Sequence, residues 1–155
     1  MKKVIVACVT AILPALCIAE PAYIGATPMD EPNGRPCRVY ISDYRPGSGA
    51  MYLGTCGWTG LKGIASYTIG WNHGNHIRVV RGQFDYGKPV SATKVTYFNK
   101  VQGTITTYTQ SEFSRSNVRN YNLDDVLTDA QQAGIRINSS IMAYTTIANY
   151  LDVFE

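Results

Sequence analysis

From residue 37 to residue 109, short stretches rich in Val, Ile, Thr and Tyr alternate with turn residues about every ten positions. The first kind of residue favours the pleated surface of a sheet, whereas Gly, Pro and Asn favour the turns between strands. This pattern predicts an antiparallel β-meander of stacked hairpins, which we expect to be wet on one face. The candidate strands are 37–44, 50–56, 62–71, 76–84, 90–98 and 103–109.

The C-terminal residues 120–155 have a different pattern of residue types and are expected to be mostly helical. Asn122 is a suitable helix cap, and Asp124 and Asp125 follow it at the positive end of the helix dipole. Gly134 is a suitable left-handed stop for this helix.

A second helix is expected to start at Asn138 or Ser139. Apolar and small residues then follow at helical spacing: Ile141, Tyr144, Thr145, Ala148 and Leu151. The alternative is a strand through 135–146, because Ile, Tyr and Thr also favour sheets. We prefer the helix, so the predicted class is mainly β (α+β), with one or two C-terminal helices.

The first nineteen residues have the pattern of a cleaved export signal. Lys2 and Lys3 precede an apolar run at 4–16, and small residues allow cleavage after Ala19. The run is shorter than the roughly 20 apolar residues that span a bilayer, so no stable membrane insertion is expected after cleavage. The sequence therefore predicts a periplasmic or secreted protein.

The mature chain is expected to form a single domain. Residues 20–36 contain four prolines and no apolar periodicity, so we interpret them as a flexible lead-in. The domain would then cover 37–155, with the β-meander at 37–110.

Removal of the export signal leaves two cysteines, Cys37 and Cys56. A zinc site would need two more ligands, and a nucleophilic thiol would need a positioned histidine; neither is visible near these residues. In an oxidising compartment the pair therefore predicts a disulfide. Such a bridge contributes about 3 kcal/mol, which is large beside the roughly 5–15 kcal/mol of a whole domain.

Charge is distributed unevenly along the chain. The formal net charge is +3, and loss of Lys2 and Lys3 lowers it by two. Residues 35–119 are basic, whereas 120–155 are acidic. One interpretation is an anionic partner for the basic part. The other is a solvated sheet face that the C-terminal segment partly neutralises.

Aromatic residues are the most suggestive excess, because the chain has eleven tyrosines and two tryptophans. Rings on one sheet face could stack on sugars or on apolar residues of a partner, while nearby cations, including Lys88 and Lys94, bind anionic groups. The alternative is ring packing across strands. The candidate binding face consists of Tyr40, Tyr52, Trp58, Trp71, Arg78, Arg81 and Tyr86.

The other groups of residues that could bind a metal or act in catalysis give only weak signals. His73 and His76 lie in one predicted turn, but no further metal ligand lies in that segment. The sequence has no nucleophile elbow, phosphate-cradling loop or nucleic-acid module, so we expect no catalytic residue, metal, cofactor or nucleic-acid partner.

A weak internal repeat runs through the predicted hairpins. The short motif Tyr-Leu-Gly-Thr at 52–55 recurs in degenerate form at 80–83 and more weakly at 102–104. Each copy has a glycine early in a predicted strand. Gly60 and Gly87 then fall in the following turns. We expect an aromatic ring to cover the backbone of the early glycine.

This pattern resembles MORN-type repeats, and more closely a group of exported bacterial MORN-like proteins. Cys37 is followed by an aromatic-x-Gly-x-Cys phrase at 52–56 and by Gly60 and Gly63, although Ala65 replaces the last glycine of the motif. The resemblance covers about residues 37–105 and is degenerate in its second repeat. It implies an elongated antiparallel sheet that serves as a scaffold or binding surface, without shared catalytic residues.

The sequence thus predicts an exported, non-enzymatic binding or scaffold protein that uses an aromatic and basic sheet face. An inhibitor or immunity-type protein is one specific case, and its partner would be a protein or a glycan. The alternative is a small periplasmic hydrolase or glycan-active enzyme that uses carboxylates such as Asp43, Asp85 or Glu112.

Overall fold

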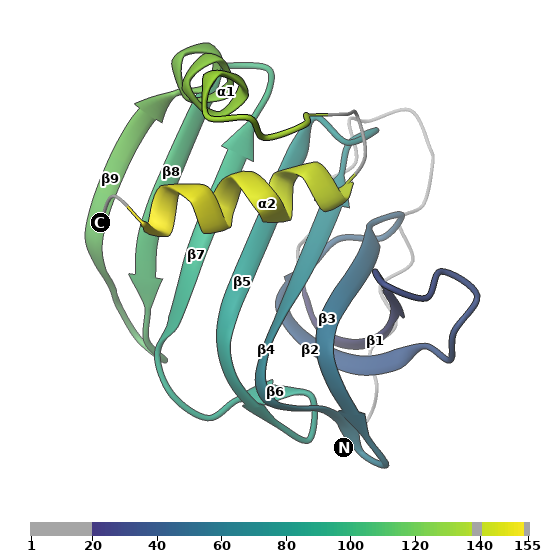
Figure 1. Cartoon of the computed structure of the whole chain (residues 1–155). Helices are drawn as coiled ribbons and strands as arrows, with labels where there is room; N and C mark the ends of the chain where they lie inside the picture. The colour runs from purple at the N-terminus through teal and green to yellow at the C-terminus, as the bar shows by residue number, and fades with distance from the viewer. Residues whose placement is uncertain (1–19, 138–140, 154–155) are drawn as a thin grey trace, which may run out of the picture.

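The computed structural model describes residues 20–137 and 141–153. These residues form nine strands and two helices (Figure 1). The elements are β1 Glu20–Pro28, β2 Cys37–Tyr44, β3 Gly49–Gly57, β4 Gly60–Trp71, β5 His76–Asp85, β6 Lys88–Pro89, β7 Thr93–Asn99, β8 Thr104–Gln110, β9 Arg115–Asn122, α1 Leu123–Gln132 and α2 Ile141–Asp152. Neither helix is long and apolar enough to cross a membrane.

The strands form one curled sheet in the order β2-β1-β3-β4-β5-β7-β8-β9, with the short β6 paired to β5. Every neighbouring pair from β3 to β9 is antiparallel, as a meander requires. The mainly β class and the C-terminal helices are confirmed, and all six expected strands are present with small differences at their ends. β1 is the exception to the meander, because it runs parallel to β3.

β1 lies where the sequence predicted a flexible lead-in, and that prediction was wrong for residues 20–28. The strand pairs with both β2 and β3. Its inward side chains include Ile24 and Ala26, whereas Tyr23 and Gly25 are exposed. The inward residues are mostly alanine or proline, so the sequence of β1 shows only a weak apolar alternation and did not predict a strand. The irregular connection is confined to 29–36.

The C-terminal part begins with a strand that the sequence did not reveal. Every residue of β9 except the half-buried Tyr121 is exposed, so β9 lacks the apolar alternation that marks other strands. α1 follows directly, and Asn122 caps it as predicted, accepting a hydrogen bond from the backbone N–H of Asp125 at 3.1 Å. Gly134 has the expected left-handed conformation, with a φ of 87°.

α2 confirms the helix in preference to the strand for the residues from Ile141 onward. Its expected start at Asn138 or Ser139 lies outside the described residues. α2 crosses one face of the sheet (Figure 1). The buried hydroxyls of Thr145 on α2 and Thr68 on β4 lie 2.8 Å apart and join helix to sheet.

Two apolar cores lie on opposite faces of the central strands. Successive side chains of a strand point to opposite faces, so Ile77 and Val79 of β5 point toward α2, whereas Val80 points toward β2. The α2 core contains Ile77, Val79, Phe98, Ile105, Leu123, Val126, Tyr144, Ile147, Ala148 and Leu151. The β2 core contains Ala26, Cys37, Val39, Ile41, Tyr52, Leu61, Ala65, Tyr67, Ile69, Val80, Phe84, Val95 and Tyr108.

The second core exists because β2 folds back over the sheet. The backbone N–H of Tyr40 donates to the carbonyl of Gly87 at 2.8 Å, and the N–H of Gly87 donates to that of Leu61 at 3.0 Å. A Cβ at Gly60 would lie 2.6 Å from the carbonyl oxygen of Arg38. Glycine is therefore required where the β3–β4 and β5–β6 turns meet β2. This fold-back gives a curled sheet in place of the elongated one that the resemblance implied.

The glycines of the internal repeat have a different environment from the one expected. At Gly54, the space where a Cβ would lie is occupied by the side chain of Ala65, and at Gly82 it is occupied by that of Thr93. These contacts replace the expected aromatic rings. The later glycines do lie in turns with positive φ, 138° at Gly60 and 76° at Gly87.

The predicted disulfide is confirmed. Cys37, at the start of β2, is bonded to Cys56, near the end of β3, with the two Cα atoms 5.7 Å apart. Cys37 is fully buried. The bridge therefore ties the folded-back strand to the hairpin that it covers.

Removing the bridge with C37A/C56S should lower the free energy of unfolding by about 3 kcal/mol, because the unfolded chain regains loop entropy. Urea denaturation with and without a reductant measures this change. The reductant should weaken the wild type and leave the variant unchanged. A wild-type protein of equal stability in both conditions would contradict the structural role of the bridge.

Replacing Gly60 by alanine should cost about 2–4 kcal/mol of folding free energy, because the new Cβ meets the β2 backbone at a strained φ. Gly47→Ala is the matched control, since Gly47 also has a positive φ, 82°, but has open space around it. That variant should lose about 1 kcal/mol. Equal losses in the two denaturation curves would contradict the close contact at Gly60.

Candidate functional site

A groove of about 680 Å³ lies on the sheet face opposite α2. β2 forms one wall, the β8–β9 turn forms the other, and the loop between β6 and β7 lies at one end. The volume is in the range of small-ligand sites, roughly 300–1,000 Å³. The groove therefore lies between the folded-back strand and the far part of the sheet.

The floor of the groove is a row of side chains that crosses four strands. Tyr67 of β4 pairs with Val80 of β5, Val80 pairs with Val95 of β7, and Val95 pairs with Tyr108 of β8. All four line the groove and are buried. Burial raises the pKa of the Tyr67 phenol above its ordinary value, so that group stays neutral and can donate a hydrogen bond.

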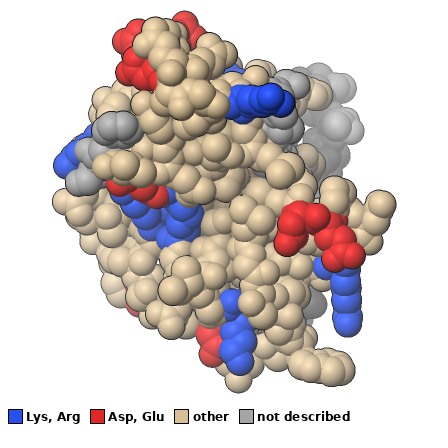
Figure 2. Space-filling view, viewed as in Figure 1, with Lys and Arg blue, Asp and Glu red and all other residues tan. Residues whose placement is uncertain are grey.

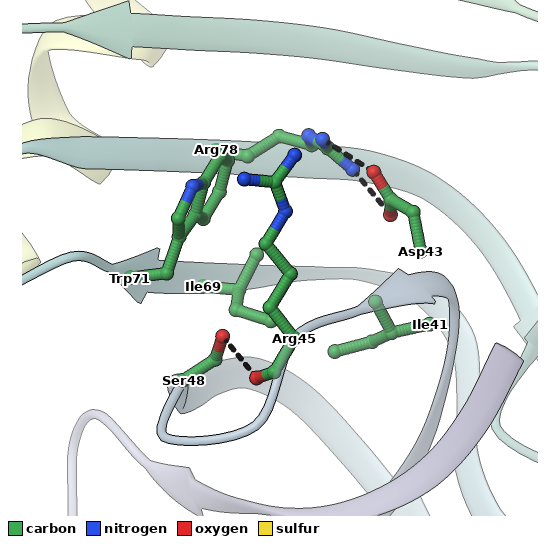
Figure 3. Close-up of a pocket in the computed structure, with 7 residues that line it drawn as sticks. All are labelled: Ile41, Asp43, Arg45, Ser48, Ile69, Trp71 and Arg78. Carbon is green, nitrogen blue, oxygen red and sulfur yellow. Dashed lines mark hydrogen bonds and ion pairs between the residues drawn. The ribbon is translucent and has the colours of Figure 1, made fainter. Parts of the chain in front are cut away.

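An ion pair lies where β2 meets this floor. Two guanidinium nitrogens of Arg78 donate to the two carboxylate oxygens of Asp43 at 2.6 and 2.7 Å (Figure 3). Burial works to raise the pKa of Asp43, but the hydrogen bonds and charge of Arg78 outweigh it and lower that pKa. For Arg78, burial is likewise outweighed by Asp43, and its pKa is raised. Both groups are therefore charged at neutral pH.

A much smaller hollow, of about 10 Å³, lies beside this ion pair (Figure 3). Trp71 lines it, and the guanidinium carbons of Arg45 and Arg78 lie 5.4 and 5.3 Å from the Trp71 ring. His76 and Tyr97 stack beside the indole, with His76 Nδ1 and Tyr97 Oη 2.7 Å apart. The hollow has room for about one water molecule, so it belongs to the packing around Arg78.

Each long wall of the groove holds a cation over an aromatic ring. Lys88 Nζ lies 4.7 Å from the ring centroid of Tyr40, and the Arg115 guanidinium carbon lies 4.5 Å from that of Tyr108. The Arg115 Nε–H also donates to the Gln110 side chain at 3.1 Å. These contacts hold two positive charges at the rim of the groove.

The structure brings together part of the predicted binding face. Tyr40 and Arg78 line the groove, and Trp71 lies beside Arg78 in the adjoining hollow. Tyr52 is 7% exposed and belongs to the core. Trp58 and Tyr86 lie exposed in hairpin turns and do not line the groove.

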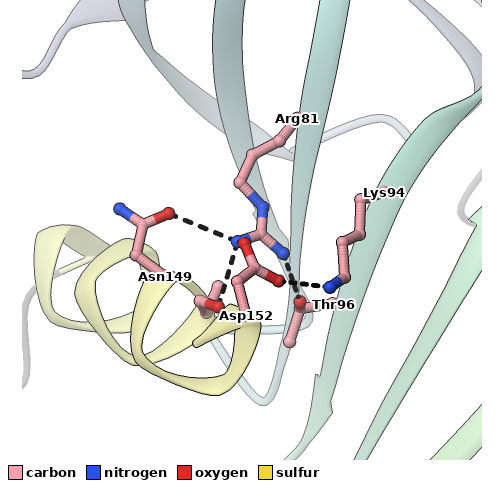
Figure 4. A network of polar contacts seen from close by, with 6 residues as sticks. Arg81, Lys94, Thr96, Asn149 and Asp152 are labelled. Atoms are coloured by element: carbon pink, nitrogen blue, oxygen red, sulfur yellow. Dashed lines mark hydrogen bonds and ion pairs between the residues drawn. The ribbon is translucent and has the colours of Figure 1, made fainter. Parts of the chain in front are cut away.

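Arg81 lies on the opposite face, so its assignment to the same face as Arg78 was wrong. The two residues are three positions apart on β5, and an odd spacing places them on opposite sides of a strand. Arg81 forms an ion pair with Asp152 of α2 (Figure 4). It also donates to the carbonyl of Ala148 at 3.0 Å. Lys94, which also pairs with Asp152 at 2.7 Å, lies on this face too.

These contacts give Arg81 and Lys94 a structural role at the C-terminal end of α2. Basic and acidic side chains lie next to one another below the helix in Figure 2. Arg81 also donates to the buried Thr96 hydroxyl at 3.0 Å (Figure 4). The network therefore holds α2 on the sheet and is separate from the groove.

Sequence reasoning missed Tyr67, Tyr108 and Arg115 as groove residues. Tyr67 and Tyr108 stand in predicted strands, but their faces depend on the register between strands, and Arg115 stands in β9, which the sequence did not predict. Threonine occurs on both faces of β8, so composition alone does not separate them. Only the pairing of Val95 with Tyr108 places that ring in the row of the floor.

Asp43, the carboxylate at the end of β2, does not suit the role of a general acid. Asp43 and Glu112 both line the groove, whereas Asp85 does not. A general acid needs a raised pKa, but Arg78 keeps that of Asp43 low. In the described part of the chain, no three His, Cys, Asp or Glu side chains gather closely enough to hold a metal ion.

Comparison of the chain with protein-family models, with curated proteins and with solved structures found no match.

The Asp43–Arg78 pair should make stability depend on pH. Because the folded-state pKa of Asp43 lies below its unfolded value, its stabilisation is complete above the unfolded pKa and is lost as pH falls through the folded pKa. At pH 7, Asp43→Asn should therefore cost about 1–2 kcal/mol of unfolding free energy. The difference from the wild type should disappear in acid. Urea denaturation of the wild type and the variant at pH 7 and in acid, below the folded-state pKa of Asp43, checks this. A difference in unfolding free energy that does not change with pH would contradict it.

Proposed function

We propose that the protein is an exported, non-enzymatic binding protein that takes an anionic part of a protein or glycan partner into the groove. The observation that carries this proposal is the cross-strand row Tyr67–Val80–Val95–Tyr108, which forms an apolar and aromatic floor beneath about 680 Å³ of open space. Binding sites commonly combine such a floor with a few placed polar groups.

The charges along the groove favour an anionic ligand. Asp43 and Arg78 neutralise each other, which leaves Lys88 and Arg115 against Glu112. Both cations are held over tyrosine rings, so little side-chain freedom is lost when a ligand binds. The groove therefore offers positive charge that is already positioned.

Hydroxyl groups at the rim support recognition of a polar ligand. Ser42, Ser91 and Ser111 line the groove, and each hydroxyl can donate and accept hydrogen bonds. The phenols below them add further donors beside apolar ring edges. Sugar hydroxyls and peptide groups are both suitable partners for this combination.

The export part of the proposal rests on the leader pattern at 1–19 and on the disulfide, which is typical of oxidising compartments. The MORN-like pattern at 37–105 supports a binding role, because that resemblance implies no common catalytic residues. A periplasmic inhibitor or immunity-type protein would fit both, with the groove receiving an acidic segment of its target.

Replacing the two rim cations together, with K88Q/R115Q, should weaken retention of the partner by about tenfold or more, since both lose a charge-assisted contact. The assay is capture from a periplasmic extract and from a panel of acidic glycans on the immobilised protein. Arg119→Gln is the matched control, because Arg119 is exposed on β9 and does not line the groove.

The control variant should bind like the wild type, and higher salt should weaken binding by the wild type more than by K88Q/R115Q. Failure of the wild type to retain any protein or glycan would contradict the proposal. Equal losses for Arg119→Gln and K88Q/R115Q would contradict the assignment of the groove as the site.

A further inference from the structure

Large apolar side chains are exposed in the turns at one end of the sheet. Trp58 in the β3–β4 turn is fully exposed, and Phe113 between β8 and β9 is 91% exposed. Tyr86 in the β5–β6 turn is 61% exposed, and Val90 follows β6 at 55%. A tryptophan or phenylalanine so exposed contributes nothing to packing, and several together indicate a contact surface.

The meander places these turns at the same end of the sheet. Neighbouring strands run in opposite directions, so the turns that carry Trp58, Tyr86 and Phe113 all lie at the lower end in Figure 1. The first two turns touch, since Gly60 and Gly87 are in backbone contact. At about 4.8 Å per strand, the row from the β3–β4 turn to the β8–β9 turn spans roughly 20 Å. We name this surface the turn end.

Charge separates the turn end from the opposite end of the molecule. The turn end carries four cations against two acids: Arg38, Lys62, Lys88 and Arg115 against Asp85 and Glu112. The opposite end carries the exposed Asp124, Asp125 and Asp129 of α1 together with three cations, Arg45, Lys100 and Arg136. Acidic side chains over α1 are visible at the top of Figure 2. The turn end therefore combines exposed aromatic rings with a net positive charge, whereas the charges at the opposite end are mixed.

We propose that the turn end docks on the surface of an anionic phospholipid bilayer, with Trp58 and Phe113 entering the headgroup region. Tryptophan and tyrosine favour the membrane–water interface, and nearby lysine and arginine add attraction to anionic lipids. A row of projecting side chains about 20 Å long fits an extended surface better than a compact ligand. This contact is peripheral, and it shares Lys88 and Arg115 with the rim of the groove.

Docking would also orient the groove toward the membrane. The loop after β6 carries Val90, the β8–β9 turn carries Phe113 and Glu112, and both segments contribute to the groove lining. A partner held in the groove would then lie beside the lipid surface.

Trp58 provides a direct test. The chain has two tryptophans, so Trp71→Phe leaves Trp58 as the single tryptophan, whose emission can be excited selectively over that of tyrosine. Its fluorescence should shift to the blue and be quenched by brominated acyl chains in vesicles that contain phosphatidylglycerol. Vesicles of phosphatidylcholine alone should give a much smaller effect, and salt should weaken the response. Mass spectrometry of the full purified chain establishes whether residues 1–19 are retained, and the Trp58 signal reports the turn end in either case.

W58A/F113A should lower partitioning to anionic vesicles by about tenfold or more in a co-sedimentation assay. Val101→Ala is the control, because Val101 is 70% exposed in the β7–β8 turn at the other end of the sheet. That variant should partition like the wild type.

Unchanged Trp58 emission on addition of anionic vesicles would overturn the proposal, even if the protein bound them through another segment. Equal losses for Val101→Ala and W58A/F113A would also overturn it. Self-association that W58A/F113A abolishes, measured by sedimentation velocity without lipid, would assign the turn end to a second copy of the chain instead.

Discussion

The backbone contact between β2 and two hairpin turns is the constraint on which the rest of the structure depends. Gly60 and Gly87 let those turns approach the backbone of Arg38 at distances that exclude any side chain. The Cys37–Cys56 disulfide holds the start of β2 at the same place, and the Asp43–Arg78 pair attaches its other end to β5. With β2 in place, the apolar side chains beneath it are removed from water, and the groove gains a wall.

The central strands support two surfaces at once, because successive side chains point to opposite faces. On β5, Ile77 and Val79 pack beneath α2, whereas Arg78 and Val80 belong to the side covered by β2. The α2 side is closed by Arg81 and its contacts with the end of the helix. The other side remains partly open, because β2 covers only part of the sheet. The difference in cover leaves one face closed by packing and an open groove on the other.

Much of the local structure could be predicted from residue types. The strands β2 to β5, β7 and β8, the cap at Asn122 and the disulfide follow from short-range preferences, since turn residues, helix caps and paired cysteines act over a few positions or a short loop. β1 and β9 escaped prediction for two different reasons. β1 has inward residues that are small or proline, and β9 is exposed on almost all sides, so neither shows a clear apolar alternation.

The sequence by itself determined the mainly β class, the positions of most strands and the presence of an aromatic and basic excess, because these depend on composition and local spacing. Only the tertiary structure decided which of those side chains share a surface. Tyr40 and Arg78 meet at the groove, while Tyr52 is buried and Arg81 faces α2. The reason is physical: shared position depends on strand register and on the fold-back of β2, and both are set by contacts between residues far apart in the chain.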